Sequence, residues 1–303
     1  MEQHLKDFCR WLEKEHYKES TISQLKNYTG AFLLWLSGEN TATETATYND
    51  LIFYIKHLRK TDGTRLINRK LGAIRKYYEY LKTTGVVTTN IATGLHVKGT
   101  RREVLHDLPE KATLEILYNS YCATNLRTQR NKTILGLLIY QGLTTGELHR
   151  LEKIHLRLRE GKIDVPGTQN SNGRTLALEA HQIIELQEYI TQARPQIIKN
   201  LKGEKDHNLK TGHQLFISEQ GSVNIKPVLL HLFRELRKDY PQIRNATRIR
   251  QGVIAHWLKT RGLREVQYMA GHRHVSSTER YRTDDLEALG AALKKHHPLA
   301  DEA

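Results

Sequence analysis

The sequence contains only two cysteines, Cys9 and Cys122, among its 303 residues. Two cysteines cannot form a disulfide framework, and no cysteine spacing typical of a zinc site occurs. No run of eighteen apolar residues occurs either, so we expect no membrane-spanning helix. The first twenty residues are amphipathic and mixed in charge, which argues against a secretory signal. These absences favour a protein of a reducing cytoplasm without a membrane partner.

Positive charge is in excess along the whole chain. Lysine and arginine number 47 against 33 acidic residues, which gives a formal net charge of +14 and a pI near 9.6. Residues 1–100 contribute +5 (15 basic against 10 acidic residues), and the other residues contribute the remaining +9. Such charge suggests a polyanionic partner, above all nucleic acid. Solvated lysines on a basic protein are the alternative explanation.

The first part of the chain contains four segments with apolar residues at helical spacing, at 3–16, 20–38, 48–58 and 64–81. The fourth segment has an apolar face and an opposite basic face. A helix that faces DNA needs such a pattern, and a solvated surface helix has it too, so both interpretations remain open. The basic face carries Arg65, Arg69, Lys70, Arg75 and Lys76.

A basic linker over 96–108 leads to a second region that is mostly helical. Helices are expected at 110–123, 129–141, 145–151, 179–200 and 227–240. Two strands, 162–165 and 174–178, flank the turn GTQNSNG. One hairpin among helices is not a repeated βαβ series, so no doubly wound fold is implied. A chain of this length can bury two separate cores.

The segment Thr247–Tyr281 combines three groups that suit phosphate chemistry. Arg250 lies near the start of an apolar helix, His272 follows a glycine turn, and Tyr281 comes nine residues later. A guanidinium binds phosphate oxygens, an imidazole forms hydrogen bonds, and a phenol can act as a nucleophile. Each residue also has an ordinary explanation, as a helix-start ion pair, a helix-end histidine and one of 14 tyrosines.

This segment resembles the C-terminal half of the catalytic domain of tyrosine recombinases, the Xer-like phage integrases. Their pattern runs H-x-L-R-H, an apolar helix ending in glycine, L-G-H, and a tyrosine nine residues on. Ile249-Arg250, Gly262, Gly271-His272 and Thr278–Tyr281 fit it. Residues 3–95 resemble the family's four-helix core-binding domain, although the N-P-a-x-x-L end of that domain lacks its proline in Asn90–Leu95.

The resemblance implies a mainly α fold with a small β-hairpin sheet. A SAM-like core-binding domain would span 1–95, the linker 96–108 and the catalytic domain 109–283, followed by a helical tail over 284–303. The tail would dock on a neighbouring protomer of a DNA-bound dimer or tetramer, or pack on its own domain. Double-stranded DNA would be the partner, at the nucleoid, with a second recombinase as a further candidate partner.

The resemblance also implies roles for individual residues. DNA would be cleaved and rejoined through a 3′-phosphotyrosyl intermediate, without a metal or another cofactor. Tyr281 would be the nucleophile, while Arg250 and His272 would hold the scissile phosphate. The candidates for DNA binding are Arg65, Arg69, Arg75, Lys76, Arg101, Arg102 and Arg174.

Four positions at which the family carries an ionisable residue are neutral in this chain. Thr144 replaces the first arginine, Thr168 the hairpin lysine, and Thr247 and Gln251 two histidines. The loss of one charged group from such a site costs on the order of 10²–10⁴ in rate.

Three interpretations therefore remain open. The chain could be an active recombinase in which Arg150, Lys153 or Arg248 fills the vacated positions. It could instead be an accessory or regulatory DNA-binding relative that is impaired in cleavage. The third interpretation is an unrelated basic helical protein that binds nucleic acid.

Overall fold

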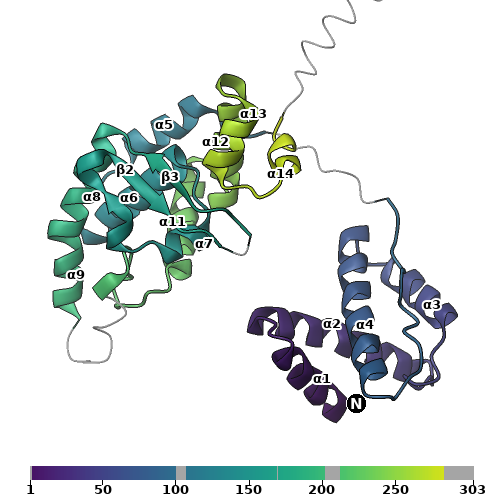
Figure 1. Cartoon of the computed structure of the whole chain (residues 1–303). Helices are drawn as coiled ribbons and strands as arrows, with labels where there is room; N and C mark the ends of the chain where they lie inside the picture. Colours follow the sequence, from purple (N-terminus) through teal and green to yellow (C-terminus); the bar gives the residue numbers. More distant parts are fainter. Residues whose placement is uncertain (1, 100–106, 169, 202–211, 283–303) are drawn as a thin grey trace, which may run out of the picture. The chain divides into compact units, whose positions relative to one another are not determined.

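The computed structural model describes residues 2–99, 107–168, 170–201 and 212–282. The chain divides into two compact units, Met1–Glu103 and Val104–Ala303, which are described separately below (Figure 1). Helices dominate both units, and a small antiparallel sheet lies in the second. The mainly α fold predicted from the sequence is confirmed. None of the described helices combines the length and the apolar character that a bilayer span requires.

Unit 1 contains four helices, α1 (Glu2–Lys14), α2 (Glu19–Gly38), α3 (Tyr48–Leu58) and α4 (Thr64–Thr83). All four predicted helices are present. The start of α3 is fixed by Asp50, whose carboxylate accepts hydrogen bonds of 2.7 Å from the backbone N–H and the hydroxyl of Thr47. The helices enclose an aromatic core in which Phe8 and Phe32 contact tyrosines of α3 and α4. This core can hold unit 1 together on its own.

The segment after α4 folds back along that helix. The amide of Asn68 pairs with the backbone of Val97, with bonds of 2.9 and 2.8 Å. Arg75 donates to the carbonyl oxygens of Ala92 (3.2 Å) and Leu95 (2.7 Å). Part of the basic face of α4 is therefore used to fasten the chain to the helix.

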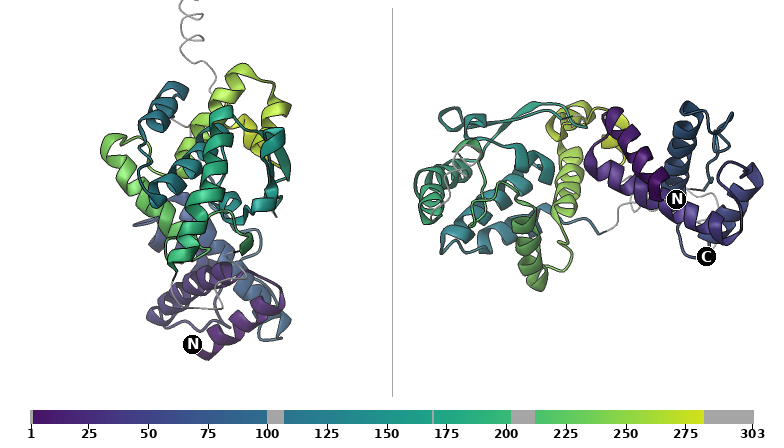
Figure 2. Two further views of the ribbon diagram at one scale, coloured as in Figure 1. Left: turned by 90° about the vertical axis from the view of Figure 1, so that its left-hand side faces the viewer. Right: turned by 90° about the horizontal axis from the view of Figure 1, so that it is seen from below.

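Unit 2 is built around α6 (Leu126–Tyr140), which is buried along most of its length. It contacts α5 (Lys111–Ser120), α8 (Ala180–Glu188), α9 (Arg194–Asn200) and α12 (Ala246–Thr260). Further α-helices of the unit are α7 (Thr145–Arg150), α11 (Lys226–Asp239), α13 (Leu263–Ala270) and α14 (Val275–Glu279) (Figure 2).

The predicted hairpin is present as β2 (Lys162–Val165) and β3 (Arg174–Ala177), which pair antiparallel with Ile163 opposite Leu176. A short strand, β1 (Leu156–Arg157), pairs with β2 and gives the order β1-β2-β3. Two residues are too few for a visible alternation of apolar and polar side chains, so the sequence did not indicate β1.

The predicted helix 179–200 is interrupted by a π-helical turn, Tyr189–Ala193. Pro195 follows that turn at the start of α9. Proline has no N–H to donate to the carbonyl four residues before it, which favours a local change of helical register.

A candidate phosphate-binding site with a buried tyrosine

The site forms where the start of α12 meets the turn between α13 and α14. Asn245 caps α12 by accepting a bond of 3.0 Å from the N–H of Arg248, and Arg250 follows on the first turns. The helix α13 ends at Gly271, whose φ of +67° lies in the left-handed region that glycine tolerates. A Cβ atom at this position would lie 2.5 Å from a guanidinium nitrogen of Arg174, so a side chain does not fit there.

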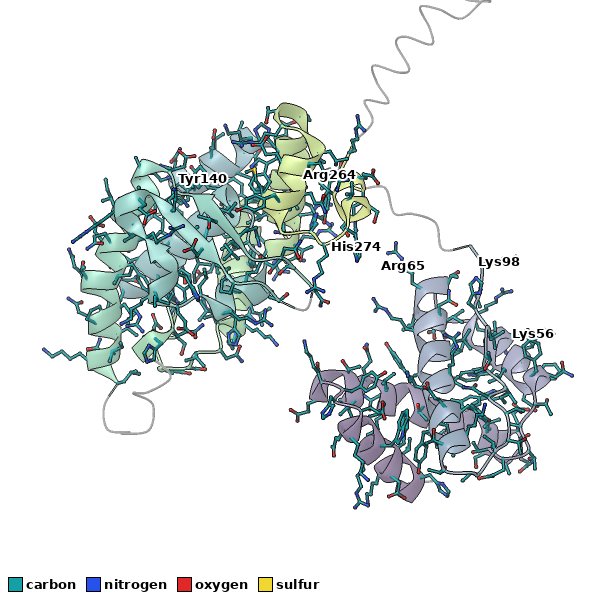
Figure 3. The ribbon with its side chains drawn as sticks, viewed as in Figure 1. Lys56, Arg65, Lys98, Tyr140, Arg264 and His274 are labelled. Carbon is teal, nitrogen blue, oxygen red and sulfur yellow. The ribbon has the colours of Figure 1, made fainter. Side chains whose placement is uncertain are left out.

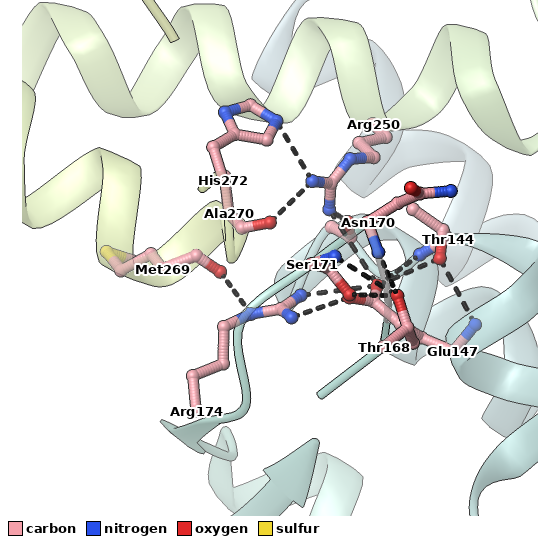
Figure 4. A network of polar contacts seen from close by, with 11 residues as sticks. Thr144, Glu147, Thr168, Asn170, Ser171, Arg174, Arg250, Met269, Ala270 and His272 are labelled. Atoms are coloured by element: carbon pink, nitrogen blue, oxygen red, sulfur yellow. Dashed lines mark hydrogen bonds and ion pairs between the residues drawn. The ribbon is translucent and has the colours of Figure 1, made fainter. Parts of the chain in front are cut away.

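Arg250 is almost fully buried, with 7% of its surface exposed, and it is held by neighbouring groups (Figure 4). Its Nη1 donates to the carbonyl oxygen of Gly142. Its Nη2 donates to the carbonyl oxygen of Ala270 at 2.6 Å and lies 3.2 Å from Nε2 of His272. The guanidinium is therefore fixed in orientation before any ligand arrives.

His272 connects Arg250 to Tyr281. Its ring stacks on the tyrosine ring with a centroid separation of 5.9 Å and an interplanar angle of 10°. Its Nδ1 lies 2.8 Å from the hydroxyl of Thr278. Burial, followed by the positive charges of Arg250 and Arg174, lowers the pKa of His272 to about 4, so the imidazole is neutral at pH 7.

Tyr281 is buried against the core of unit 2, with 8% of its surface exposed. The guanidinium of Arg280 lies 5.3 Å from the centre of its ring. The three residues that the sequence singled out, Arg250, His272 and Tyr281, are thus brought together in space. Their catalytic roles remain a prediction.

A buried ion pair between Arg174 and Glu147 lies next to Arg250. Arg174 and Glu147 are 0% and 1% exposed, and their side chains form bonds of 2.6 and 3.3 Å. Arg174 also donates to the carbonyl oxygen of Met269 at 2.7 Å. Burial opposes ionisation of Glu147, but the bonds and charge of Arg174 outweigh it and hold the pKa of Glu147 below its ordinary value. In this DNA-free structure the guanidinium of Arg174 is enclosed within the protein, and its contact with DNA stays a prediction.

Thr144 and Thr168, which occupy two of the four neutral positions, form hydrogen bonds within their own turns. The hydroxyl of Thr144 accepts from the N–H of Glu147 and donates to its carboxylate, so it caps α7. The hydroxyl of Thr168 accepts from the N–H groups of Asn170 and Ser171 inside the hairpin turn. Neither hydroxyl replaces a lost positive charge.

The hairpin turn is joined to the histidine turn by several bonds. The N–H of Asn172 donates to Gly271 at 2.9 Å, and Arg273 donates to the carbonyl oxygen of Thr168 at 3.1 Å. A further bridge links Ser171 with His272. The sequence analysis missed Glu147, Thr278 and Arg273. The Thr144-x-x-Glu147 spacing of a capping box could have indicated the first of these.

The other predicted DNA-binding residues differ in their surroundings. Arg65 and Arg69 lie on the exposed side of α4, where Figure 3 shows Arg65 pointing away from the helix start. Lys76 forms an ion pair of 2.8 Å with Glu79. Arg75 binds the backbone carbonyls described above, and its contact with DNA stays a prediction. Arg101 and Arg102 lie outside the described residues.

No cluster of three or more His, Cys, Asp or Glu side chains able to bind a metal ion occurs among the described residues. The arrangement of Arg250, His272 and Tyr281 offers hydrogen-bond donors, a neutral imidazole and a phenol. Such a set suits the binding and attack of a phosphate group.

Comparison with family models gives two matches. The model described as "Phage integrase family" matches residues 108–287, and the model described as "Phage integrase, N-terminal SAM-like domain" matches residues 5–85.

Curated relatives extend over the same length. The tyrosine recombinase XerC of Pseudomonas savastanoi pv. phaseolicola (strain 1448A / Race 6) is 25% identical, over 99% of this chain and 97% of that protein. The tyrosine recombinase XerD of Lacticaseibacillus casei is 22% identical, over 96% of this chain and 97% of that protein.

Among solved structures, XerH recombinase bound to palindromic difH substrate, in a post-cleavage complex, is similar with a TM-score of 0.73 at 14% identity. That match covers 96% of this chain and 83% of the XerH chain. A lambda integrase dimer bound to a COC′ core site is similar with a TM-score of 0.63 at 14% identity, over 94% of this chain and 77% of that chain. These likenesses concern the fold.

Proposed function

The chain belongs to the phage integrase family, and from this premise we propose that it is a site-specific DNA recombinase that works through a 3′-phosphotyrosyl intermediate. The observation that carries the proposal is the convergence of Arg250, His272 and Tyr281 in one buried cluster. The three residues come from different elements of unit 2, and the stacked tyrosine lies beside a fixed guanidinium.

In the proposed reaction the phenol oxygen of Tyr281 attacks the phosphorus of the scissile phosphodiester. The new bond joins the tyrosine oxygen to phosphorus, the bond to the 5′ oxygen breaks, and a proton passes to that leaving oxygen. Attack by the 5′ hydroxyl of a second strand reverses these steps and releases the tyrosine. The energy of the bond is kept in the intermediate, so no nucleotide is consumed.

Arg250 is the proposed phosphate ligand. A guanidinium has five N–H groups, and three of them are engaged by the described carbonyl oxygens and by His272. Both N–H groups of Nη2 are among these three, so a bidentate contact with phosphate through Nη2 has to replace its bond to Ala270 or its contact with His272. The side chain is already held in one orientation, so it loses little conformational freedom when a phosphate takes the place of His272.

A second candidate function is DNA binding without cleavage, as an accessory or regulatory relative. The observation in its favour is the state of Thr144 and Thr168, whose hydroxyls cap a helix and close a turn. The site would then lack the extra charge that phosphoryl transfer uses. Both functions share the same DNA partner.

Duplex DNA is the proposed partner, in the cytoplasm at the nucleoid. Structures of similar fold contain a recombinase on its difH site and an integrase dimer on a core site, which supports DNA binding and assembly of several protomers on DNA. The exposed Arg65 and Arg69 of α4 are proposed phosphate ligands. The segment after residue 283 is proposed to couple neighbouring protomers, and a second recombinase could complete the complex.

The test is a covalent-trapping assay. The protein is incubated with nicked duplexes that carry the DNA flanking its gene, so that cleavage releases a short fragment and traps the protein on the DNA. Tyr281→Phe should abolish the adduct. Tyr240→Phe is the matched control, because that hydroxyl contacts only Ser120 among the described groups. An adduct that persists in Tyr281→Phe would reject the proposed nucleophile, and salt-sensitive binding without any adduct would favour the second function.

A further inference from the structure

The two ring nitrogens of His272 face chemically different partners. Nε2 lies 3.2 Å from Nη2 of Arg250, and Nδ1 lies 2.8 Å from the hydroxyl oxygen of Thr278. A neutral imidazole carries one proton, so one nitrogen donates a hydrogen bond and the other accepts one. Which nitrogen carries the proton decides what His272 can do for a bound phosphate.

The contact with Arg250 identifies the tautomer present in this structure, because a guanidinium only donates hydrogen bonds. If Nε2 carried the proton, two N–H groups would face each other across 3.2 Å inside a buried cluster. Nε2 must therefore accept from Arg250, and the proton of the neutral ring lies on Nδ1. The charges that surround the ring favour the neutral form, as described above.

Thr278 is placed to accept a hydrogen bond from the Nδ1–H group of His272. Its side chain is fully buried on α14, and its hydroxyl oxygen can accept from Nδ1 at 2.8 Å. Free histidine in water favours the other tautomer, with the proton on Nε2. The protein must therefore supply the preference, and a buried acceptor on the Nδ1 side is a sufficient cause.

We propose that Thr278 is a positioning residue that holds His272 in the Nδ1-protonated tautomer. In this tautomer Nε2 accepts a hydrogen bond from Arg250, and the imidazole ring stacks on the ring of Tyr281. The inference rests on the proposed function in assigning these three residues to one reaction site. In this DNA-free arrangement Nε2 of His272 accepts from Arg250 and has no N–H to offer a phosphate. Donation to a phosphate from Nε2 requires a second proton on the ring or a change of tautomer. DNA binding therefore has to replace the contact between Arg250 and His272 with a contact between Arg250 and the phosphate.

The test reads the tautomer directly and needs neither DNA nor activity. Protein labelled with ¹⁵N-histidine in a deuterated background is studied at pH 7 by long-range ¹H–¹⁵N correlation, and His272→Gln identifies the signals of interest. The wild type should show a protonated Nδ1 and an unprotonated Nε2 at this residue. Thr278→Val keeps the shape, removes the hydroxyl and leaves a buried Nδ1–H without an acceptor. The population should therefore shift toward Nε2-H with the contact to Arg250 released, and Thr278→Ser should restore the wild-type pattern.

A wild type with the proton on Nε2 would overturn the inference, whatever the variants do. So would a Thr278→Val protein that keeps the wild-type pattern. Ser276→Ala is the matched control, because Ser276 lies on the same short helix and is exposed. Since the measurement does not depend on cleavage, a protein that fails the covalent-trapping assay can still pass this one, and the two failures are distinguishable.

A kinetic arm tests the consequence for Tyr281. If the wild type forms the adduct, Thr278→Val should slow its formation about tenfold, which is the effect of one lost hydrogen bond on a positioned group. Thr278→Ser should recover most of the rate. Equal losses in Thr278→Val and Thr278→Ser would indicate a packing role in place of a tautomeric one.

Discussion

The buried pair of Glu147 and Arg174 provides a prediction whose size follows from the structure. Glu147→Gln keeps the volume of the side chain and removes its charge. The carboxylate accepts bonds from Arg174 and from the backbone and hydroxyl of Thr144, and it lies 4.0 Å from Arg250. Neutralising it leaves two buried guanidinium groups without a counter-charge. Removing one partner of a buried ion pair costs about 3–5 kcal/mol of unfolding free energy.

A matched control is available in the pair of Arg261 and Glu265. Their side chains are 45% and 51% exposed, although their atoms approach to 2.5 Å. Exposed pairs of this kind contribute about 0–1 kcal/mol, so Glu265→Gln should change stability little. For a unit of this size, we expect Glu147→Gln to lower the Tm by roughly 6–20 °C, since each kcal/mol shifts it by about 2–4 °C.

The assay is urea and thermal unfolding of the full chain, followed by circular dichroism at pH 7. Equal losses in Glu147→Gln and Glu265→Gln would refute the reasoning, because the buried carboxylate would then not be the charge partner of Arg174. The pH dependence gives a second check. The folded pKa of Glu147 is lowered, so its contribution is present above the unfolded pKa near 4.5 and is lost as the pH falls through the folded pKa.

Three further predictions concern other parts of the chain. Gly271→Ala should destabilise unit 2 by about 1–3 kcal/mol because of its positive φ, whereas Gly262→Ala, which meets nothing within 4 Å, should be neutral in the same unfolding assay. Arg69→Gln should reduce the slope of log K against log salt by about 0.9 in a DNA-binding titration, and Arg75→Gln should instead lower the stability of unit 1 with the slope unchanged. His272 stays neutral down to about pH 4, so the stability it contributes should fall as the pH drops from its ordinary pKa of 6.5 toward 4, and His272→Gln should remove that part of the pH dependence of unfolding.

Local signals in the sequence were sufficient to predict the positions of most helices. The bounds of α3 agree with the prediction because a capping residue and an apolar periodicity occur together at Thr47–Leu58. The interruption of the helix 179–200 was not foreseen, although Pro195 was visible. A proline in a helical pattern indicates a disturbance without saying whether the helix ends, bends or changes register.

Long-range pairing explains what the sequence could not reveal about the site. Arg174 and Glu147 are 27 residues apart in the sequence, and no periodicity links a strand residue to a residue of a short helix. Arg174 was therefore predicted as a DNA ligand from the family resemblance alone, and its buried partner Glu147 was not anticipated. The spacing of Gly271-His272 and Tyr281 is local, and the short helix α14 between them brings the two rings together.

The charge of the buried cluster limits what it can do alone. The two buried arginines contribute +2, Glu147 contributes −1 and neutral His272 contributes nothing, so the sum is +1. A phosphodiester already carries −1, and nucleophilic attack places more negative charge on its oxygens. Additional positive charge must therefore come from exposed cations beside the site, such as Arg273 and Arg280, or from a partner protein. Cleavage by this chain should accordingly depend more on the assembled DNA complex than on the isolated protein.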